Sequence, residues 1–155
     1  MSTYHETLQD VFHRFEHALS RPGTPREVVE WGLRTGVLEL PRLDPVAALT
    51  HDMSKALREE YRTDAAGRRY RANHAVSSTS AGQQIWLWGD METAPRDFME
   101  KAFATRRRGI VSDCIQLRTD VDAYNAARRS ARPIQTVLDF TQDVEEQMAM
   151  IGLRS

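Results

Sequence analysis

The chain has 155 residues, of which 41% are hydrophobic and 28% are charged, so it can form one globular domain with an appended element. Its formal net charge of −1 excludes a histone-like protein that coats nucleic acid through bulk charge, and any nucleic-acid site must come from local clustering of basic residues. The single cysteine, Cys114, excludes a disulfide framework and a cysteine-built zinc site.

The first predicted helix runs from about Tyr4 to Ser20. Thr3 and Glu6 form its capping box, and its apolar face contains Leu8, Val11, Phe12, Phe15 and Leu19. The run from His13 to His17 matches the H-x-x-E-H pattern of the inverted zinc peptidases. At ~100° per residue the two histidines lie opposite the apolar face, so we interpret them as a solvated pair and expect no metal.

The second predicted helix begins with Thr24 as its cap, followed by Pro25 at the first helical position and by Glu27, which can reach back to the cap nitrogen. It runs to about Thr35 and stops at Gly36. The residues expected to face the core are Val28, Trp31 and Leu38, with either Val29 or Leu33.

The third predicted helix starts at Asp44-Pro45 and has two distinct faces. A helical wheel assigns a buried face to Val46, Leu49, Met53, Ala56, Leu57 and Tyr61. The opposite side carries one exposed cationic stripe at i, i+4, i+7 and i+11, formed by His51, Lys55, Arg58 and Arg62. Asp52 and Glu59 flank this stripe and weaken its field.

After Gly67 the period changes to that of a β-strand, and a basic alternating segment runs from Arg68 to Val76. Residues 77–82 are small and polar, which predicts a flexible loop, and residues 83–88 predict the second strand of a hairpin. Trp86 and Trp88 share one face of that strand. We expect this face to pack under the following long helix, although strand aromatics can also stack on unpaired bases.

Three helices followed by a hairpin is the element order of a winged helix-turn-helix, and residues 3–88 resemble that family. More narrowly, the segment from Pro25-Arg26-Glu27-Val28 through Leu57 to the Gly67 turn resembles the HARE-type winged helices, which some restriction-associated proteins share with a bacterial RNA polymerase accessory subunit. The resemblance implies that the third helix enters the DNA major groove and that the hairpin tracks the phosphates. It places base contacts at His51, Ser54, Lys55 and Arg58, and backbone contacts at Arg62, Arg68, Arg69 and Arg71.

A long helix is predicted from Arg96 to Arg129, with a coiled-coil seam formed by Phe103, Ile110, Cys114, Leu117, Val121 and Tyr124. Within it, residues 106–108 are an arginine run of the kind that normally forms a solvated helix face. Residues 130–133 break this helix, and a second amphipathic helix follows from Ile134. The resulting antiparallel hairpin either pairs with a second copy or folds back on the first domain, and we favour the homodimer because DNA readers usually pair two half-sites.

The sequence therefore predicts a mainly α protein with a small β-hairpin, divided into a winged-helix domain over residues 1–92 and a helical hairpin over residues 93–155. The expected function is double-stranded DNA binding by a regulator or accessory factor. The alternative is an adaptor that docks a protein partner through the C-terminal helices. No phosphate loop or nucleophile elbow occurs, so no catalysis and no cofactor are expected. No apolar run approaches ~18 residues and no signal-peptide pattern begins the chain, so we expect a cytoplasmic protein without a membrane partner.

Overall fold

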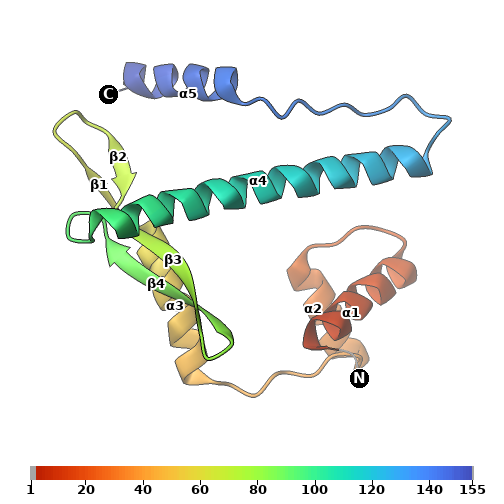
Figure 1. Cartoon of the computed structure of the whole chain (residues 1–155). Coiled ribbons are helices and arrows are strands. Elements are labelled where there is room, and N and C mark those ends of the chain that lie inside the picture. The colour runs from red at the N-terminus through yellow and green to blue at the C-terminus, as the bar shows by residue number, and fades with distance from the viewer. Residues whose placement is uncertain (1–2, 155) are drawn as a thin grey trace. The chain divides into compact units, whose positions relative to one another are not determined.

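The computed structural model describes residues 3–154. These residues form five helices and two separate two-stranded antiparallel sheets, which confirms the predicted class of a mainly α protein with a small β component (Figure 1). The elements in chain order are α1 (Tyr4–Leu19), α2 (Pro25–Thr35), α3 (Pro45–Glu59), β1 (Tyr61–Thr63), β2 (Arg69–Arg71), β3 (Asn73–Ser80), β4 (Gln83–Asp90), α4 (Arg96–Ala127) and α5 (Thr141–Arg154).

The chain divides into two compact units, Met1–Leu49 and Thr50–Ser155. The division concerns contacts within the chain. The division into a domain of residues 1–92 and a helical hairpin of residues 93–155 stays a prediction.

The first unit is built on α1 and α2, and both helices begin with the predicted capping boxes. In α1 the Thr3 hydroxyl accepts from the Glu6 amide at 3.2 Å, and the Glu6 carboxylate accepts from the Thr3 amide at 2.6 Å. The core contains Val11, Phe15 and Val28, and the Phe15 ring meets the Trp31 ring edge-on with 5.9 Å between centroids.

The third helix is capped as predicted, because the Asp44 carboxylate accepts from the backbone amides of residues 46 and 47. Its predicted buried face is wrong, since Val46, Leu49 and Met53 are 74%, 69% and 60% exposed. A wheel gives the direction of an apolar face but does not say whether another element covers it. The helix ends at Glu59, so Arg62 does not belong to the cationic helical stripe and lies on β1.

The first sheet is a short hairpin that the sequence did not predict, in which β1 pairs with β2 and Arg62 lies opposite Tyr70. Its turn is closed by the Asp64 carboxylate, which accepts from the backbone amides of Ala66 and Arg68, both at 2.9 Å. The continuous strand predicted from Arg68 to Val76 is wrong, because it is divided at Ala72 between two sheets.

The second sheet is the hairpin of β3 and β4, whose eight cross-strand pairs run from Asn73–Asp90 to Ser80–Gln83. Ala81 and Gly82 form its turn with φ of 50° and 77°. Two positive φ values suit a two-residue turn that follows the right-handed twist of the strands. The loop predicted for residues 77–82 is therefore wrong, since the strand continues to Ser80. Small polar residues allow a strand where a partner strand supplies the packing.

Helix α4 packs on the hairpin face that carries His74 and Gly89, which lie opposite each other on β3 and β4. The ring centroids of His74 and Phe103 are 5.3 Å apart. A Cβ at Gly89 would lie 2.9 Å from the Phe98 ring, so α4 approaches too closely there for a larger residue. The tryptophans lie on the other face and Trp86 is 53% exposed, so the expectation that they pack under α4 is wrong.

The segment that follows α4 does not form the helix predicted to start at Ile134. Residues 132–140 have no regular secondary structure, and α5 begins only at Thr141. The Asn125 side chain fixes the start of this segment, since its amide donates to the Ile134 carbonyl at 2.9 Å and its oxygen accepts from the Ile134 amide at 3.0 Å. Within residues 3–154, no helix combines the length and apolar character needed to cross a membrane.

The core of the first unit gives a direct test of its packing. We expect Phe15→Ala to lower the free energy of unfolding of this unit by about 3 kcal/mol, because Phe15 is 1% exposed and its removal leaves a cavity. Phe12→Ala is the matched control on the same helix, since Phe12 is 37% exposed. Urea unfolding followed by circular dichroism measures both, and an equal effect of the two variants would contradict the assigned core.

Candidate nucleic-acid interface

Two sets of hydrogen bonds connect the elements of the second unit near Ala72. This alanine is fully buried, its amide donates to the Glu60 carbonyl at 3.0 Å, and its carbonyl accepts from the Met91 amide at 2.8 Å. Beside it, Arg62 donates to both carboxylate oxygens of Asp90, at 2.7 and 2.5 Å. The end of β4 is thereby attached both to β1 and to the residue between β2 and β3.

The Arg62–Asp90 pair sets the charge state of Asp90. The hydrogen bonds from Arg62 lower the pKa of the Asp90 carboxyl from 3.8 to about 2, and a bond from the Glu92 amide adds to this effect. Arg62 also lies 3.5 Å from the Glu92 carboxylate. Its charge is thus compensated within the protein.

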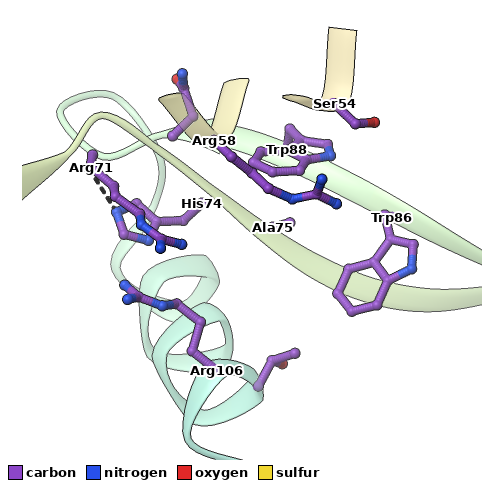
Figure 2. A pocket seen from close by; sticks show the side chains of 10 residues that line it. Ser54, Arg58, Arg71, His74, Ala75, Trp86, Trp88 and Arg106 are labelled. Carbon is purple, nitrogen blue, oxygen red and sulfur yellow. Dashed lines mark hydrogen bonds between the residues drawn. The ribbon is translucent and has the colours of Figure 1, made fainter. Parts of the chain in front are cut away.

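A hollow of about 300 Å³ lies where α3, the β3–β4 hairpin and α4 meet (Figure 2). Its lining combines guanidinium groups, indole rings and one buried imidazole. The lining residues are Ser54, Arg58, Arg71, Asn73, His74, Ala75, Trp86, Trp88, Thr105 and Arg106. We call it the arginine hollow.

Three positive charges reach the arginine hollow from three different elements. Arg58 lies on α3, Arg71 on β2 and Arg106 on α4. Among the side chains described between residues 3 and 152, no carboxylate lies within ion-pair distance of any of the three. Figure 2 shows Arg71 and Arg106 extending toward the same region from opposite sides. Uncompensated like charges gathered in one concave site favour an anionic ligand.

Two indole rings form the other end of the hollow. Trp88 is half-buried and the Arg58 guanidinium lies over its ring, 5.8 Å from the centroid. Their cross-strand neighbours on the same face are small, because Ala75 is opposite Trp88 and Ser77 is opposite Trp86. Small neighbours leave ring surface uncovered.

The buried imidazole is His74, which is 4% exposed. Its Nε2 lies 2.9 Å from the Arg71 carbonyl, a bond drawn in Figure 2, and so carries the proton. Nδ1 is then an acceptor, and no donor among the described residues reaches it. Burial lowers the pKa of His74, and the charges of Arg106 and Arg71 lower it further, so the ring is neutral at pH 7.

The structure divides the residues that the resemblance assigned to DNA. Ser54, Arg58 and Arg71 come together in the arginine hollow, whereas Arg62 pairs with Asp90 and Arg68 pairs with Asp64 at 2.7 Å. The remaining three lie outside the hollow. His51 and Lys55 are exposed on α3, and the Arg69 guanidinium lies over the Tyr61 ring at 4.1 Å.

Sequence reasoning missed Asn73, His74 and Arg106 as members of a site. Arg106 belongs to an arginine run that gives no local sign of which member faces inward. His74 stands at a position that the alternating pattern assigns to the buried face of a strand, and this pattern does not indicate a ligand site. Asn73 donates to the Leu57 carbonyl at 3.2 Å and to the Glu60 carboxylate at 2.9 Å, so it also joins β3 to the end of α3.

The residues predicted to form a dimer seam lie along α4, and most are partly or largely exposed. Exposure is 59% at Ile110, 43% at Leu117 and 45% at Tyr124, while Cys114 and Val121 are half-buried. Phe103 is 46% exposed and also contacts His74.

The histidine pattern in α1 lies on the surface. His13 is 3.8 Å from the Glu16 carboxylate and 73% of its side chain is exposed. In the part of the chain that the structure describes, no three potential metal ligands gather at one point.

Comparison of the chain with protein-family models, with curated proteins and with solved structures gives no match.

The Arg62–Asp90 pair can be tested by titration. We expect Arg62→Gln to raise the pKa of Asp90 from about 2 toward 3.8, because the guanidinium no longer stabilises the carboxylate. Since the folded state holds this pKa below its unfolded value, the pair stabilises the fold above pH 3.8 and loses that contribution as the pH falls toward 2.

Carboxyl carbon NMR against pH measures this shift. Arg68→Gln is the matched control, because Arg68 pairs with Asp64 and its loss should leave the Asp90 titration unchanged. An Asp90 pKa that is the same in the Arg62 variant and in the natural protein would contradict the pairing.

Proposed function

We propose that this protein binds DNA through the arginine hollow and the adjoining face of α3. The observation that carries the proposal is the convergence of Arg58, Arg71 and Arg106 without a carboxylate partner in the described part of the chain. Each guanidinium offers planar, paired donors that match the oxygens of a phosphodiester. Arg71 and Arg106 would hold backbone phosphate, which fixes position without reading sequence.

Helix α3 adds the second element of the proposal. His51, Lys55 and Arg58 follow one another at helical spacing and all three are exposed. A helix that presents such a row can enter the major groove of double-stranded DNA, where long polar side chains reach the base edges. The role proposed for the protein is that of a regulator or accessory factor acting on duplex DNA.

The near-zero net charge does not conflict with this proposal. Acidic residues neutralise many arginines locally, as Asp90 does for Arg62 and Asp64 for Arg68, and the hollow keeps its charge. Phosphate contacts made by a few arginines give binding that depends steeply on salt.

DNA binding should therefore depend on the hollow in a measurable way. We expect the natural protein to bind random duplex DNA at low salt, and Arg71→Gln or Arg106→Gln to weaken binding by about tenfold, since each removes a charge-assisted hydrogen bond. The slope of log K against log salt should become shallower by about one for each variant.

The matched control is Arg107→Gln, which removes the same charge from the next residue of α4, outside the hollow. Fluorescence anisotropy with a labelled duplex measures all three. The proposal fails if the folded natural protein shows no DNA binding at low salt, and the site assignment fails if the Arg106 and Arg107 variants behave alike.

A homodimer through α4 completes the proposal. The helix is 32 residues long, and beyond Met99 and Ala102 the described side chains of α4 are not buried. The seam residues from Ile110 to Tyr124 are spaced by alternating steps of three and four, as in a helix that pairs with a copy of itself. Two copies would place two DNA-binding faces in one particle, which raises affinity for paired half-sites.

The dimer predicts a change of mass in one variant. We expect Leu117→Asp to convert a dimer to a monomer, because it places a charge in the centre of the apolar seam. Gln116→Glu adds the same charge at the neighbouring polar position and should leave the mass unchanged. Light scattering coupled to size exclusion measures both, and a monomeric natural protein would remove the dimer from the proposal.

A second candidate function is that of an adaptor for another protein. It is favoured by exposed apolar side chains on α4 and α5, where Ile115 is 63% exposed and Ile151 is 61% exposed. An adaptor would make no phosphate contacts, so the salt series separates the two functions.

A further inference from the structure

We propose that the arginine hollow holds one unpaired nucleotide of a nucleic-acid strand, with its base stacked on Trp86 and its phosphate bound by Arg71 and Arg106. This inference rests on the proposed DNA binding and names the part of the ligand that enters the hollow. A flipped, overhanging or single-stranded nucleotide would satisfy it, whereas a fully paired duplex would not.

Charge and ring surface lie at opposite ends of the arginine hollow. In the view of Figure 2, the Arg58 guanidinium lies between the Arg71 and Arg106 side chains at one end of the hollow and the Trp86 indole at the other. A nucleotide has the same division, with an anionic phosphate at one end and a flat apolar base at the other. A base that stacks on an aromatic side chain gains roughly 1–3 kcal/mol, largely independent of its identity.

Trp86 is accessible to solvent. Its indole is 53% exposed, and its cross-strand neighbour on the same face is the small residue Ser77. A large aromatic side chain left open beside three guanidinium groups that have no carboxylate partner among the described side chains suits a flat, anionic ligand. A paired base inside a duplex cannot offer its face, because its neighbours in the stack cover both sides.

His74 also lines the arginine hollow. Nδ1 of this buried, neutral ring is an acceptor without a donor among the described residues. A phosphodiester has no proton to donate to it. Nucleobases carry N–H donors, whereas the phosphodiester and the deoxyribose within a DNA strand carry none, so the base is the part of a nucleotide that can donate to this acceptor.

The volume of the hollow agrees with one nucleotide. About 300 Å³ lies at the lower end of the range for small-molecule sites and leaves no room for a stack of several bases. Further nucleotides of the strand would continue outside the hollow.

The experiment compares three ligands by fluorescence anisotropy with the full chain at low salt. They are a short blunt duplex, the same duplex with a thymidine overhang, and the same duplex with an overhang of equal length made of abasic residues. The abasic overhang keeps the phosphates and removes the bases. We expect the natural protein to bind the thymidine overhang about tenfold more tightly than either of the other two.

Variants at Trp86 identify the residue responsible. Trp86→Ala should remove the preference for the thymidine overhang, and Trp86→Phe should restore most of it, since a phenyl ring still stacks. The matched control is Ile85→Ala, because Ile85 is 39% exposed on the opposite face of β4 and should leave the preference unchanged. Thermal melting by circular dichroism confirms that each variant is folded.

The outcomes separate this inference from the proposed function. Equal binding of all three ligands overturns the nucleotide site and leaves duplex binding intact. Binding of the duplex with the thymidine overhang without binding of the blunt duplex upholds the nucleotide site and overturns duplex recognition, and binding of none overturns both. Thymidine monophosphate is added to the same assay as a competitor. Displacement of the thymidine overhang at an equal concentration would show a site for free nucleotides and overturn the assignment to a strand.

Discussion

The second unit depends on the backbone of Ala72. Both hydrogen-bonding groups of this residue are used, one toward the end of α3 and one toward the end of β4, and its methyl group is fully buried. Arg71 precedes it and Asn73 follows it, so the same residue that joins the two sheets also orients two side chains of the arginine hollow. The backbone positions of Arg71 and Asn73 beside the hollow are therefore fixed by main-chain hydrogen bonds.

Charge in this protein is arranged locally. Many arginines are paired with a carboxylate one helical turn away, as in Arg14–Asp10, Arg26–Glu30 and Arg96–Glu100, and such exposed pairs contribute little to stability. Arg62 and Asp90 are different, because they join residues far apart in the chain and fix the end of β4. The three arginines of the hollow remain uncompensated within the described side chains, so a chain of nearly neutral composition can still present one concentrated positive field.

Local signals in the sequence predicted the parts of the fold that local chemistry determines. The capping residues Thr3 and Thr24 fixed the starts of α1 and α2, and the absence of proline over residues 96–127 predicted the long helix α4. Pairing between β1 and β2 was not predicted, because three-residue strands carry too little alternation to be recognised. For the same reason Arg62 was assigned to a helix, although its partner Asp90 lies 28 residues further along the chain.

The candidate site was predicted only in part. Ser54, Arg58 and Arg71 could be selected as exposed basic or polar positions on two elements, but their meeting with Arg106 is a product of tertiary packing. Trp86 shows the limit of alternation as evidence. The alternating pattern placed Trp86 on one face of a strand. The same pattern does not show that α4 covers the other face.

The turn at the exposed tip of the β3–β4 hairpin consists of two residues, Ala81 and Gly82. Its two residues determine which side chain of β4 lies opposite which side chain of β3. An insertion there that shifts the pairing by one position would exchange the two faces of β4 and move both tryptophans to the side that α4 occupies. Loop tips usually tolerate added residues, but at this tip the number of residues fixes the position of ring surface in the hollow.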